Sequence, residues 1–319
     1  MRVDEVVAVD HEGRKFLWVD IEAPSKIELE ALADQYMLPF HAVKDCLDAE
    51  HFPKFERFGD LNFIILRAFD DQSPSDSDSI QELTRKIAVF ESESLVISIH
   101  RREQNFFGAI KDIWRTKVRV GEDCKSHIIM LSIVAGVIES YRAPMEVNRA
   151  HLEAFEAKVF KHSGDTFEDG YFLKRRANSF QQVIHMSLDL LPSLGKVYSD
   201  ESSQIQDVKE NGERIQYLTR EFHESISSLV TLQLSLQSHR MTVGSFRTNE
   251  VMRVLTIVSV CFMPLNLFTG IYGMNFEHIP ELKWEYGFLY VVVLMIFSVG
   301  VILFLFMKNG FFEDQNSKV

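Results

Sequence analysis

Two uncharged apolar runs near the C-terminus set the architecture of this 319-residue chain. The first covers Val254 to Tyr272 and the second Phe288 to Met307, and neither contains a charged side chain. Each approaches the ~20 residues that a helix needs to cross ~30 Å of hydrocarbon. A pair of buried core helices is the alternative, but a core helix of a soluble protein normally keeps one polar face. The second run has no such face, so we expect two transmembrane helices, at 251-272 and 288-307.

The charges on either side of these runs indicate how the chain is oriented. Three arginines precede the first run, whereas the loop between the runs, residues 273-287, holds three glutamates and one lysine. Because positive side chains favour the cytoplasmic side of a membrane, we expect this loop to face outward. Both termini, including the tail 308-319, would then lie in the cytoplasm. The chain would be a multi-pass protein of the cell (inner) membrane.

The composition of the whole chain argues against several classes of function. Its 34 basic and 46 acidic residues give a net charge of −12, which disfavours nucleic-acid binding. The three cysteines are too scattered for a disulfide framework or a structural zinc site. The sequence has no phosphate-binding glycine loop and no nucleophile elbow. We therefore expect neither an enzyme nor an ATP-driven pump, and no organic cofactor.

A stripe of polar and small side chains follows one face of the first run. Its members recur at alternating steps of three and four residues, so at ~100° per residue they stay within an arc of about 100°. Helix packing through small residues is one interpretation. The other is a pore wall, because amide and hydroxyl oxygens suit a hydrated cation and rings of methionine narrow the bore. The stripe comprises Asn249, Met252, Thr256, Ser259, Met263, Asn266 and Gly270, with Leu255 at its edge.

The pore interpretation has chemical consequences. Two helices cannot enclose an aqueous channel, so several chains must surround a common axis, most simply as a cyclic homo-oligomer. The remaining apolar surface would contact membrane lipid. The stripe contains no carboxylate, which suits an ion that gives up its water reluctantly, such as Mg²⁺.

The chain before the membrane runs divides into two regions. Residues 1-125 are expected to form a cytoplasmic α/β domain, in which Ser25 caps a helix over Lys26–Met37. Residues 126-250 are predicted to form long helices, interrupted at Pro192, Gly195 and Gly212. From Glu213 to Gly270 one helix would extend about 87 Å at ~1.5 Å per residue and act as a stalk. The predicted strands are Lys15–Ile21, Leu61–Phe69, Leu83–Phe90 and Leu95–His100.

The first membrane run ends in Tyr272-Gly273-Met274-Asn275, with Gly273 placed as the helix cap. A short acidic loop and the second run follow. In this position the Gly-Met-Asn tripeptide is highly specific, and the chain resembles the CorA family of divalent-cation channels. The resemblance covers nearly the whole chain. Other segments that match are Trp18–Asp20, Lys44–Asp48, Pro53–Asp60, Leu173–Arg176, Asn249–Thr256, Phe262–Pro264 and Gly270–Tyr272.

The resemblance implies a homopentameric funnel, with the cytoplasmic domain below ten membrane helices and the first span of each chain lining the pore. Gly273, Met274 and Asn275 would form the selectivity filter, where a ring of Asn275 holds hydrated Mg²⁺. Glu277 and Glu281 would add negative potential at this outer mouth. Co²⁺ and Ni²⁺ would also pass. The family's pore-lining positions correspond to Asn249, Met252, Leu255, Met263 and Asn266.

The resemblance also implies regulatory Mg²⁺ bound between cytoplasmic domains. The candidate ligands are Asp70 and Asp71, after a predicted strand, and Asp207 and Glu210, near the stalk. Local spacing identifies none of them. Ions that bind the closed state better would shift the population toward it.

Two departures from the family pattern and two competing functions stay open. Asn266 stands where many relatives carry threonine or another small residue, and the tail carries Glu313 and Asp314 where the family is often basic. A Zn²⁺ or Co²⁺ transporter of the related ZntB-like branch is the first alternative, although Met274 favours the magnesium branch. A membrane-anchored scaffold or sensor without a pore is the second, and the polar stripe speaks against it.

Overall fold

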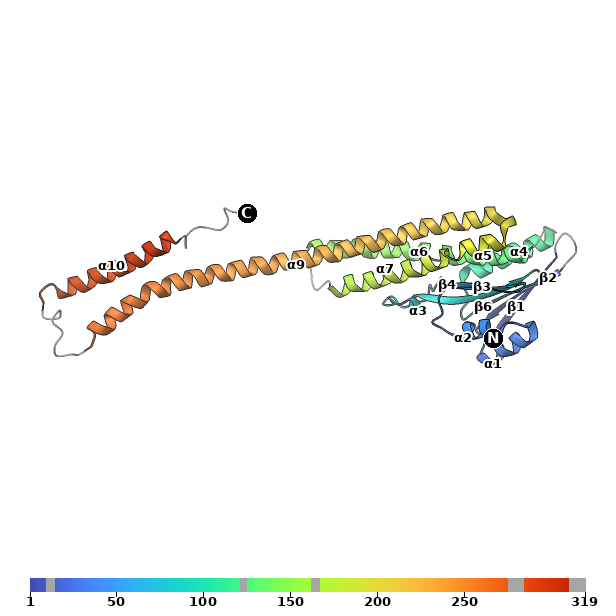
Figure 1. Ribbon diagram of the computed structural model, residues 1–319, viewed down its shortest axis with the longest axis horizontal. Helices are drawn as coiled ribbons and strands as arrows, with labels where there is room; N and C mark the ends of the chain where they lie inside the picture. Colours follow the sequence, from blue (N-terminus) through green and yellow to red (C-terminus); the bar gives the residue numbers. More distant parts are fainter. Residues whose placement is uncertain (10–14, 121–124, 162–166, 275–283, 310–319) are drawn as a thin grey trace. The chain divides into compact units, whose positions relative to one another are not determined.

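The computed structural model describes residues 1-9, 15-120, 125-161, 167-274 and 284-309 (Figure 1). The chain forms two compact units, Met1–Gln233 and Leu234–Val319.

The first unit is built on a six-stranded sheet with the order β1-β2-β6-β5-β4-β3. Strands β2 and β6 are parallel, and the other neighbouring pairs are antiparallel. The four predicted strands are confirmed with small shifts at their ends. The strands are β1 (Arg2–Val9), β2 (Lys15–Glu22), β3 (Lys54–Phe58), β4 (Leu61–Phe69), β5 (Thr84–Ser92) and β6 (Leu95–His100).

Sequence reasoning missed β1 and β3, which form the two edges of the sheet. Their sequences, RVDEVVAV and KFERF, place charged residues among apolar ones. Charged side chains are a common protection of edge strands against pairing with other chains. They also weaken the apolar signal from which strands are recognised.

Both faces of the sheet are covered by helices. On β4, Phe63 and Ile65 enter one hydrophobic core, whereas Ile64 and Leu66 enter the other. Helices α1 (Lys26–Tyr36) and α2 (Phe40–Leu47) cover the first face, and α4 (Asn105–Val120), α5 (Ser126–Glu139) and α7 (Phe167–Leu188) lie on the second (Figure 1). A strand buried on both faces has an almost continuous apolar sequence, which explains why β4 was easy to predict.

The start of α1 follows the prediction closely. The Ser25 hydroxyl accepts a hydrogen bond from the Glu28 amide at 3.3 Å, and the Glu28 carboxylate accepts one from the Ser25 amide at 2.7 Å. This reciprocal arrangement satisfies two backbone donors at the helix N-terminus. Helix α1 ends at Tyr36, because Met37 adopts a left-handed conformation with φ of 52°.

A buried polar network connects β2 and β6 with α4. The Asp20 carboxylate accepts hydrogen bonds from Ser98, from His100 Nε2 at 3.1 Å and from Lys111 Nζ at 2.6 Å. The Ser98 hydroxyl also accepts a hydrogen bond from the Trp18 indole at 3.0 Å. Burial alone would raise the pKa of Asp20, but the His100 and Lys111 contacts outweigh it and the pKa is lowered. The Trp18–Asp20 segment thus has a structural role.

The first unit also contains two short helices, the long α6, a 3₁₀ turn and the first part of α9, the longest helix of the chain. They are α3 (Ile80–Leu83), α6 (Arg142–Lys161), α8 (Leu191–Val197), the short 3₁₀ turn η1 (Ser199–Glu201) and α9 (Ser202–Tyr272). Pro192 lies in the first turn of α8. The predicted interruption at Gly212 is wrong, because α9 continues through this residue.

Gly212 is buried, and a Cβ built on it would lie 2.1 Å from Cδ2 of Leu188. The absence of a side chain lets α9 approach the end of α7. Gly212 therefore serves helix packing and does not mark a helix boundary.

The second unit begins within α9, which continues from Leu234 to Tyr272. It also contains α10 (Gly287–Lys308). Pro264 lies inside α9 and does not end it. The predicted domain boundaries at 125 and 250 are not tested by this division and stay predictions.

Candidate functional site

Among the residues that the structure describes, three helical segments are long and apolar enough to cross a membrane by length and composition. In Ser126–Lys161, 56% of the most apolar window is buried inside the first unit, whereas in Ser199–Tyr272 and Gly287–Lys308 the share is 0%. Helix α5 supplies Ile129 and Ile133 to the core of the sheet, so its apolar side chains are already covered. The apolar runs of α9 and α10 need lipid or other chains to cover them.

The stripe residues of α9 lie on an exposed face of the single chain. Asn249, Met252, Leu255, Thr256, Ser259, Met263, Asn266 and Gly270 are all exposed. The half-buried residues of the same segment are Arg253, Ile257, Val260, Cys261, Pro264, Leu265, Phe268 and Tyr272. At ~100° per residue, the centre of this half-buried face lies about 140° from the centre of the stripe. The two faces are therefore nearly opposite.

Helix α10 also has a half-buried face, and it meets α9 near the connecting loop. Thr269 and Tyr272 of α9 line one cavity of about 510 Å³ together with Val291, Val292 and Met295 of α10. The half-buried residues of α10 recur at helical spacing: Val291, Val292, Leu294, Met295, Ser298, Val299, Ile302 and Phe306. At this end of the unit, α10 thus lies beside Thr269 and Tyr272, which are not members of the stripe.

Two threonine hydroxyl groups in this segment of α9 donate hydrogen bonds to backbone oxygens of the same helix. The Thr256 hydroxyl donates to the Met252 carbonyl oxygen at 2.7 Å, and the Thr269 hydroxyl donates to that of Leu265 at 2.8 Å. Each hydroxyl oxygen keeps its acceptor capacity. On the stripe, Thr256 can therefore accept a hydrogen bond from water without leaving its own proton unpaired.

Gly273 and Met274 are the described part of the Gly-Met-Asn tripeptide. The Gly273 amide donates to the Thr269 carbonyl oxygen at 2.9 Å and closes α9 after Tyr272. A Cβ on Gly273 would lie 2.8 Å from that same oxygen, which is too close for a carbon atom. The turn therefore requires glycine. Asn275, Glu277 and Glu281 lie outside the described residues, so their predicted roles stay predictions.

The predicted regulatory residue Asp70 is buried and charge-compensated. Its carboxylate forms ion pairs with Arg85 at 2.8 Å and Arg102 at 3.2 Å. A metal ion would have to compete with two guanidinium groups for this carboxylate. Asp71 next to it is exposed and accepts a hydrogen bond from the Asn105 amide at 2.9 Å.

The other two candidates, Asp207 and Glu210, are exposed on the first part of α9. In the described part of the chain, no group of three or more His, Cys, Asp or Glu side chains is arranged to hold a metal ion. A regulatory ion at these positions would need ligands from more than one chain. The four regulatory candidates stay predictions.

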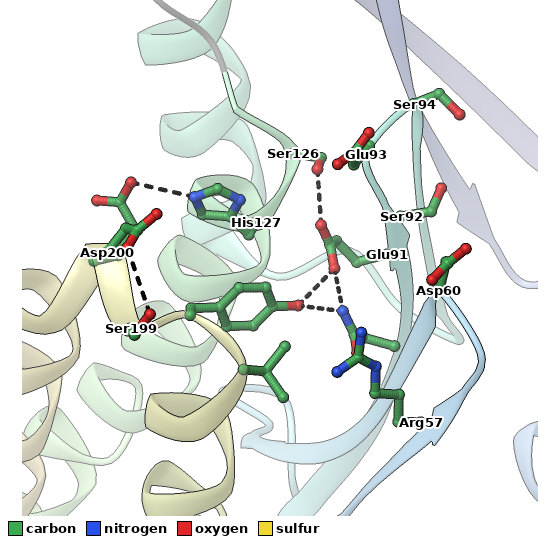
Figure 2. Close-up of a pocket in the computed structure, with 14 residues that line it drawn as sticks. Arg57, Asp60, Glu91, Ser92, Glu93, Ser94, Ser126, His127, Ser199 and Asp200 are labelled. Carbon is green, nitrogen blue, oxygen red and sulfur yellow. Dashed lines mark hydrogen bonds and ion pairs between the residues drawn. The ribbon is translucent and has the colours of Figure 1, made fainter.

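The first unit contains a polar pocket of about 560 Å³ that sequence reasoning missed (Figure 2). Its inner wall holds the buried Glu91, whose carboxylate accepts hydrogen bonds from Ser126 at 2.7 Å, Asn62 at 2.8 Å and the Tyr198 hydroxyl at 2.5 Å. Burial and the adjacent Glu91 raise the pKa of Tyr198. These residues are far apart in the sequence, so no local sequence motif predicts the pocket.

Taken together, these features define a class of membrane transport protein. An α/β domain carries a long helix that continues into an apolar helix, and a second apolar helix follows. The chain belongs to the family of CorA-like Mg²⁺ transporter proteins, whose model matches residues 13–308. This match confirms the resemblance inferred from the tripeptide.

Individual relatives agree with the family match. The cobalt/magnesium transport protein CorA of Thermotoga maritima is 26% identical over 275 residues, which cover 84% of this chain and 74% of that protein. The complete structure of the CorA magnesium transporter from Methanocaldococcus jannaschii has a TM-score of 0.66 at 20% identity, covering 98% of this chain and 99% of that one.

A third likeness extends to the ZntB group. The crystal structure of the ZntB cytoplasmic domain from Vibrio parahaemolyticus has a TM-score of 0.51 at 16% identity, covering 71% of this chain and 88% of that one. At these identities the structural likenesses show the fold alone. They confirm an α/β domain followed by a long helix, and for the complete CorA structure also the C-terminal helix.

Proposed function

We propose that five copies of this chain form a channel that conducts hydrated Mg²⁺ into the cytoplasm, and also Co²⁺ and Ni²⁺. Membership in the CorA-like family supports divalent-cation transport. The Thermotoga relative, a cobalt/magnesium transport protein, supports the choice of ions. The chain would lie in the cell (inner) membrane with both termini in the cytoplasm.

The observation that carries this proposal is the arrangement of faces on α9. The stripe is exposed, and the half-buried face of α9 lies nearly opposite to it. If copies of the chain surround an axis with α10 on the outside, the stripes meet at the centre. A neutral, oxygen-bearing surface would then line the axis, and apolar side chains would face lipid.

The chemistry of the stripe suits an ion that keeps its hydration shell. Mg²⁺ dehydrates reluctantly, so a conducting surface should bind its water and leave the inner shell intact. The amides of Asn249 and Asn266 and the hydroxyl of Thr256 can do so, while rings of Met252 and Met263 narrow the bore. The driving force would be the ion gradient and the membrane potential, worth ~4.6 kcal/mol for a divalent ion at 100 mV.

Selection would occur at the end of α9. The Gly273 turn directs the chain away from the helix, and Asn275 follows two residues later. Five Asn275 amides would hold hydrated Mg²⁺, with Glu277 and Glu281 supplying negative potential. Gating would come from Mg²⁺ bound between cytoplasmic domains, with Asp71, Asp207 and Glu210 as accessible ligands. Asp70 would join them only after losing its arginine partners.

A flux measurement tests the proposal. Wild-type protein in liposomes should take up Mg²⁺ under an inward-negative potential, and Asn275→Ala should lose uptake. Asn309→Ala serves as the matched control, since Asn309 is an exposed asparagine that follows α10. Normal conduction by Asn275→Ala would refute the assignment of the filter. An absence of ion flux in the wild type would favour a scaffold or sensor without a pore.

A zinc transporter is the second candidate, because the fold also resembles the ZntB cytoplasmic domain. The two functions differ in whether Mg²⁺ competes with Zn²⁺ for uptake. A magnesium channel should take up less Zn²⁺ as Mg²⁺ rises to millimolar concentration, whereas a dedicated zinc carrier should be indifferent. Zn²⁺ uptake that is unaffected by Mg²⁺ would therefore favour the second candidate.

A further inference from the structure

The cavity between the end of α9 and the start of α10 lies within the second unit. Its volume of about 510 Å³ is within the ~300–1,000 Å³ typical of sites for small organic molecules. Its lining on α10 runs from Gly287 to Met295, which is ~12 Å along the helix axis at ~1.5 Å per residue. The cavity is therefore elongated along α10 and can hold a ligand with a head and a tail.

This cavity begins at the edge of a membrane span. The uncharged run of α10 starts at Phe288, and the exposed aromatic residues Trp284, Tyr286 and Tyr290 lie around that point. Tryptophan and tyrosine are enriched where a membrane meets water. If α9 and α10 cross the membrane, as the proposed function requires, the start of the cavity lies among lipid headgroups. Its deeper lining, which ends at Met295, then lies among acyl chains.

The polar side chains of the lining offer hydrogen-bond acceptors. Glu285 is exposed and has no ion-pair partner in the part of the chain that the structure describes. The Thr269 hydroxyl donates its proton to the Leu265 carbonyl oxygen at 2.8 Å, so only its acceptor capacity remains for a ligand. The Tyr272 hydroxyl can also accept. A cationic group with N–H donors suits this part of the lining, because hydrogen bonds to a carboxylate are strongest when the donor is charged.

The N-terminus of α10 can receive a negative group of the same ligand. Gly287 and Phe288, the first residues of this helix, line the cavity beside Glu285. The side chain of the N-cap residue Tyr286 makes no capping hydrogen bond to the described residues. Amide groups in the first turn of a helix have no partner within the helix, and they carry the positive end of its dipole. This end of the cavity therefore suits a phosphate group next to a cationic one.

We propose that this cavity binds a phospholipid with an ethanolamine headgroup. The ammonium group donates to Glu285 beside the ring of Trp284, and the phosphate lies at the N-terminus of α10. One acyl chain follows the helix along Val291, Val292 and Met295. Choline fits less well, because its quaternary nitrogen has no N–H group to donate. The bound lipid would also contact Gly273, which shapes the turn before Asn275.

Tryptophan fluorescence tests this site. Of the three tryptophans, Trp284 lines the cavity, whereas Trp18 and Trp114 are buried in the first unit. The full-length protein is placed in vesicles of equal amounts of phosphatidylethanolamine and phosphatidylcholine with identical acyl chains. Bromine, which quenches tryptophan on contact, is carried by the chains of one lipid or of the other. Quenching should show about threefold higher occupancy beside Trp284 by phosphatidylethanolamine. Equal quenching by the two lipids would overturn the proposal.

A pair of variants tests the headgroup contact. Glu285→Gln keeps the shape of the side chain and the neighbouring tryptophan but removes the charge, so the preference for phosphatidylethanolamine should disappear. The matched control is Glu250→Gln, which removes an exposed carboxylate from α9 outside the cavity and should keep the preference. Loss of the preference in both variants, or its retention in Glu285→Gln, would contradict the role of Glu285.

Mg²⁺ uptake by the same vesicles separates this site from the proposed channel. A wild type that takes up Mg²⁺ but shows no lipid preference would refute the lipid site alone. A lipid preference without Mg²⁺ uptake would support the lipid site and count against the channel.

Discussion

The Lys111 ammonium group on α4 lies 2.6 Å from the Asp20 carboxylate on β2, and both residues are buried. Removing one partner of a buried charge pair leaves the other uncompensated, which costs ~3 kcal/mol or more. We expect Asp20→Asn to lower the thermal stability of the full-length protein by this order. Asp112→Asn, on the exposed side of α4, is the control and should change stability by less than ~1 kcal/mol. Equal melting temperatures of the two variants would contradict the structural role of Asp20.

The Asp20 carboxylate should also make the stability of the protein depend on pH in the acid range. Its folded pKa is lowered from the ordinary value of 3.8. The carboxylate therefore contributes stability that is fully present above the unfolded pKa and is lost as pH falls through the folded pKa. Melting of wild type should fall more steeply below pH 4 than melting of Asp20→Asn. Parallel profiles would show that Asp20 titrates alike in the folded and unfolded chains.

Gly212 should be sensitive to any side chain, in contrast to the exposed Gly244 on the same helix. A Cβ at Gly212 would overlap the end of Leu188, whereas one at Gly244 would meet nothing within 4 Å. We expect Gly212→Ala to be less stable than Gly244→Ala by about 1 kcal/mol, because the end of the flexible Leu188 side chain must turn away from the new methyl group. Gly244→Ala should be neutral or gain up to ~1 kcal/mol through helix propensity. The double variant Gly212→Ala, Leu188→Ala tests the cause, because it should recover part of the loss.

Gly273 should be essential for conduction through its backbone geometry. A Cβ at this position would lie 2.8 Å from the Thr269 carbonyl oxygen, so Gly273→Ala must open the turn that precedes Asn275. We expect Mg²⁺ uptake into liposomes to fall at least ~10-fold, because a small displacement of a binding group is costly. Gly300→Ala on α10 is the control, since a Cβ there meets nothing within 4 Å. Full conduction by Gly273→Ala would show that the geometry of this turn does not position the filter.

Local signals explain what could be predicted from the sequence. Ser25 and Glu28 interact across three residues, and β4 is buried on both faces. Each feature therefore produces a recognisable pattern within a short stretch of sequence. The tripeptide at Gly273 led to the family directly. Glu91, Asn62, Ser126 and Tyr198 could not be found this way, because only the folded sheet and helices bring them together. The prediction at Gly212 was wrong because glycine occurs both at helix ends and inside helices that pack closely, and the sequence does not distinguish the two cases.

The predicted regulatory residues show a further limit. Asp70 and Asp71 are adjacent in the sequence, yet one is buried between two arginines and the other is exposed. The sequence gives the charge of a carboxylate but not its partners. The stripe on α9 is the opposite case, because helical periodicity alone placed its members on one exposed face.

Cysteine accessibility tests most directly whether the stripe lines a wet axis. In full-length protein whose native cysteines are replaced by serine, Met263→Cys and Asn266→Cys should react with a membrane-impermeant thiol reagent, and the reaction should block Mg²⁺ uptake. Leu265→Cys and Phe268→Cys, on the half-buried face, should stay unmodified and conduct. Modification of the second pair with protection of the first would contradict a pore formed by the stripe.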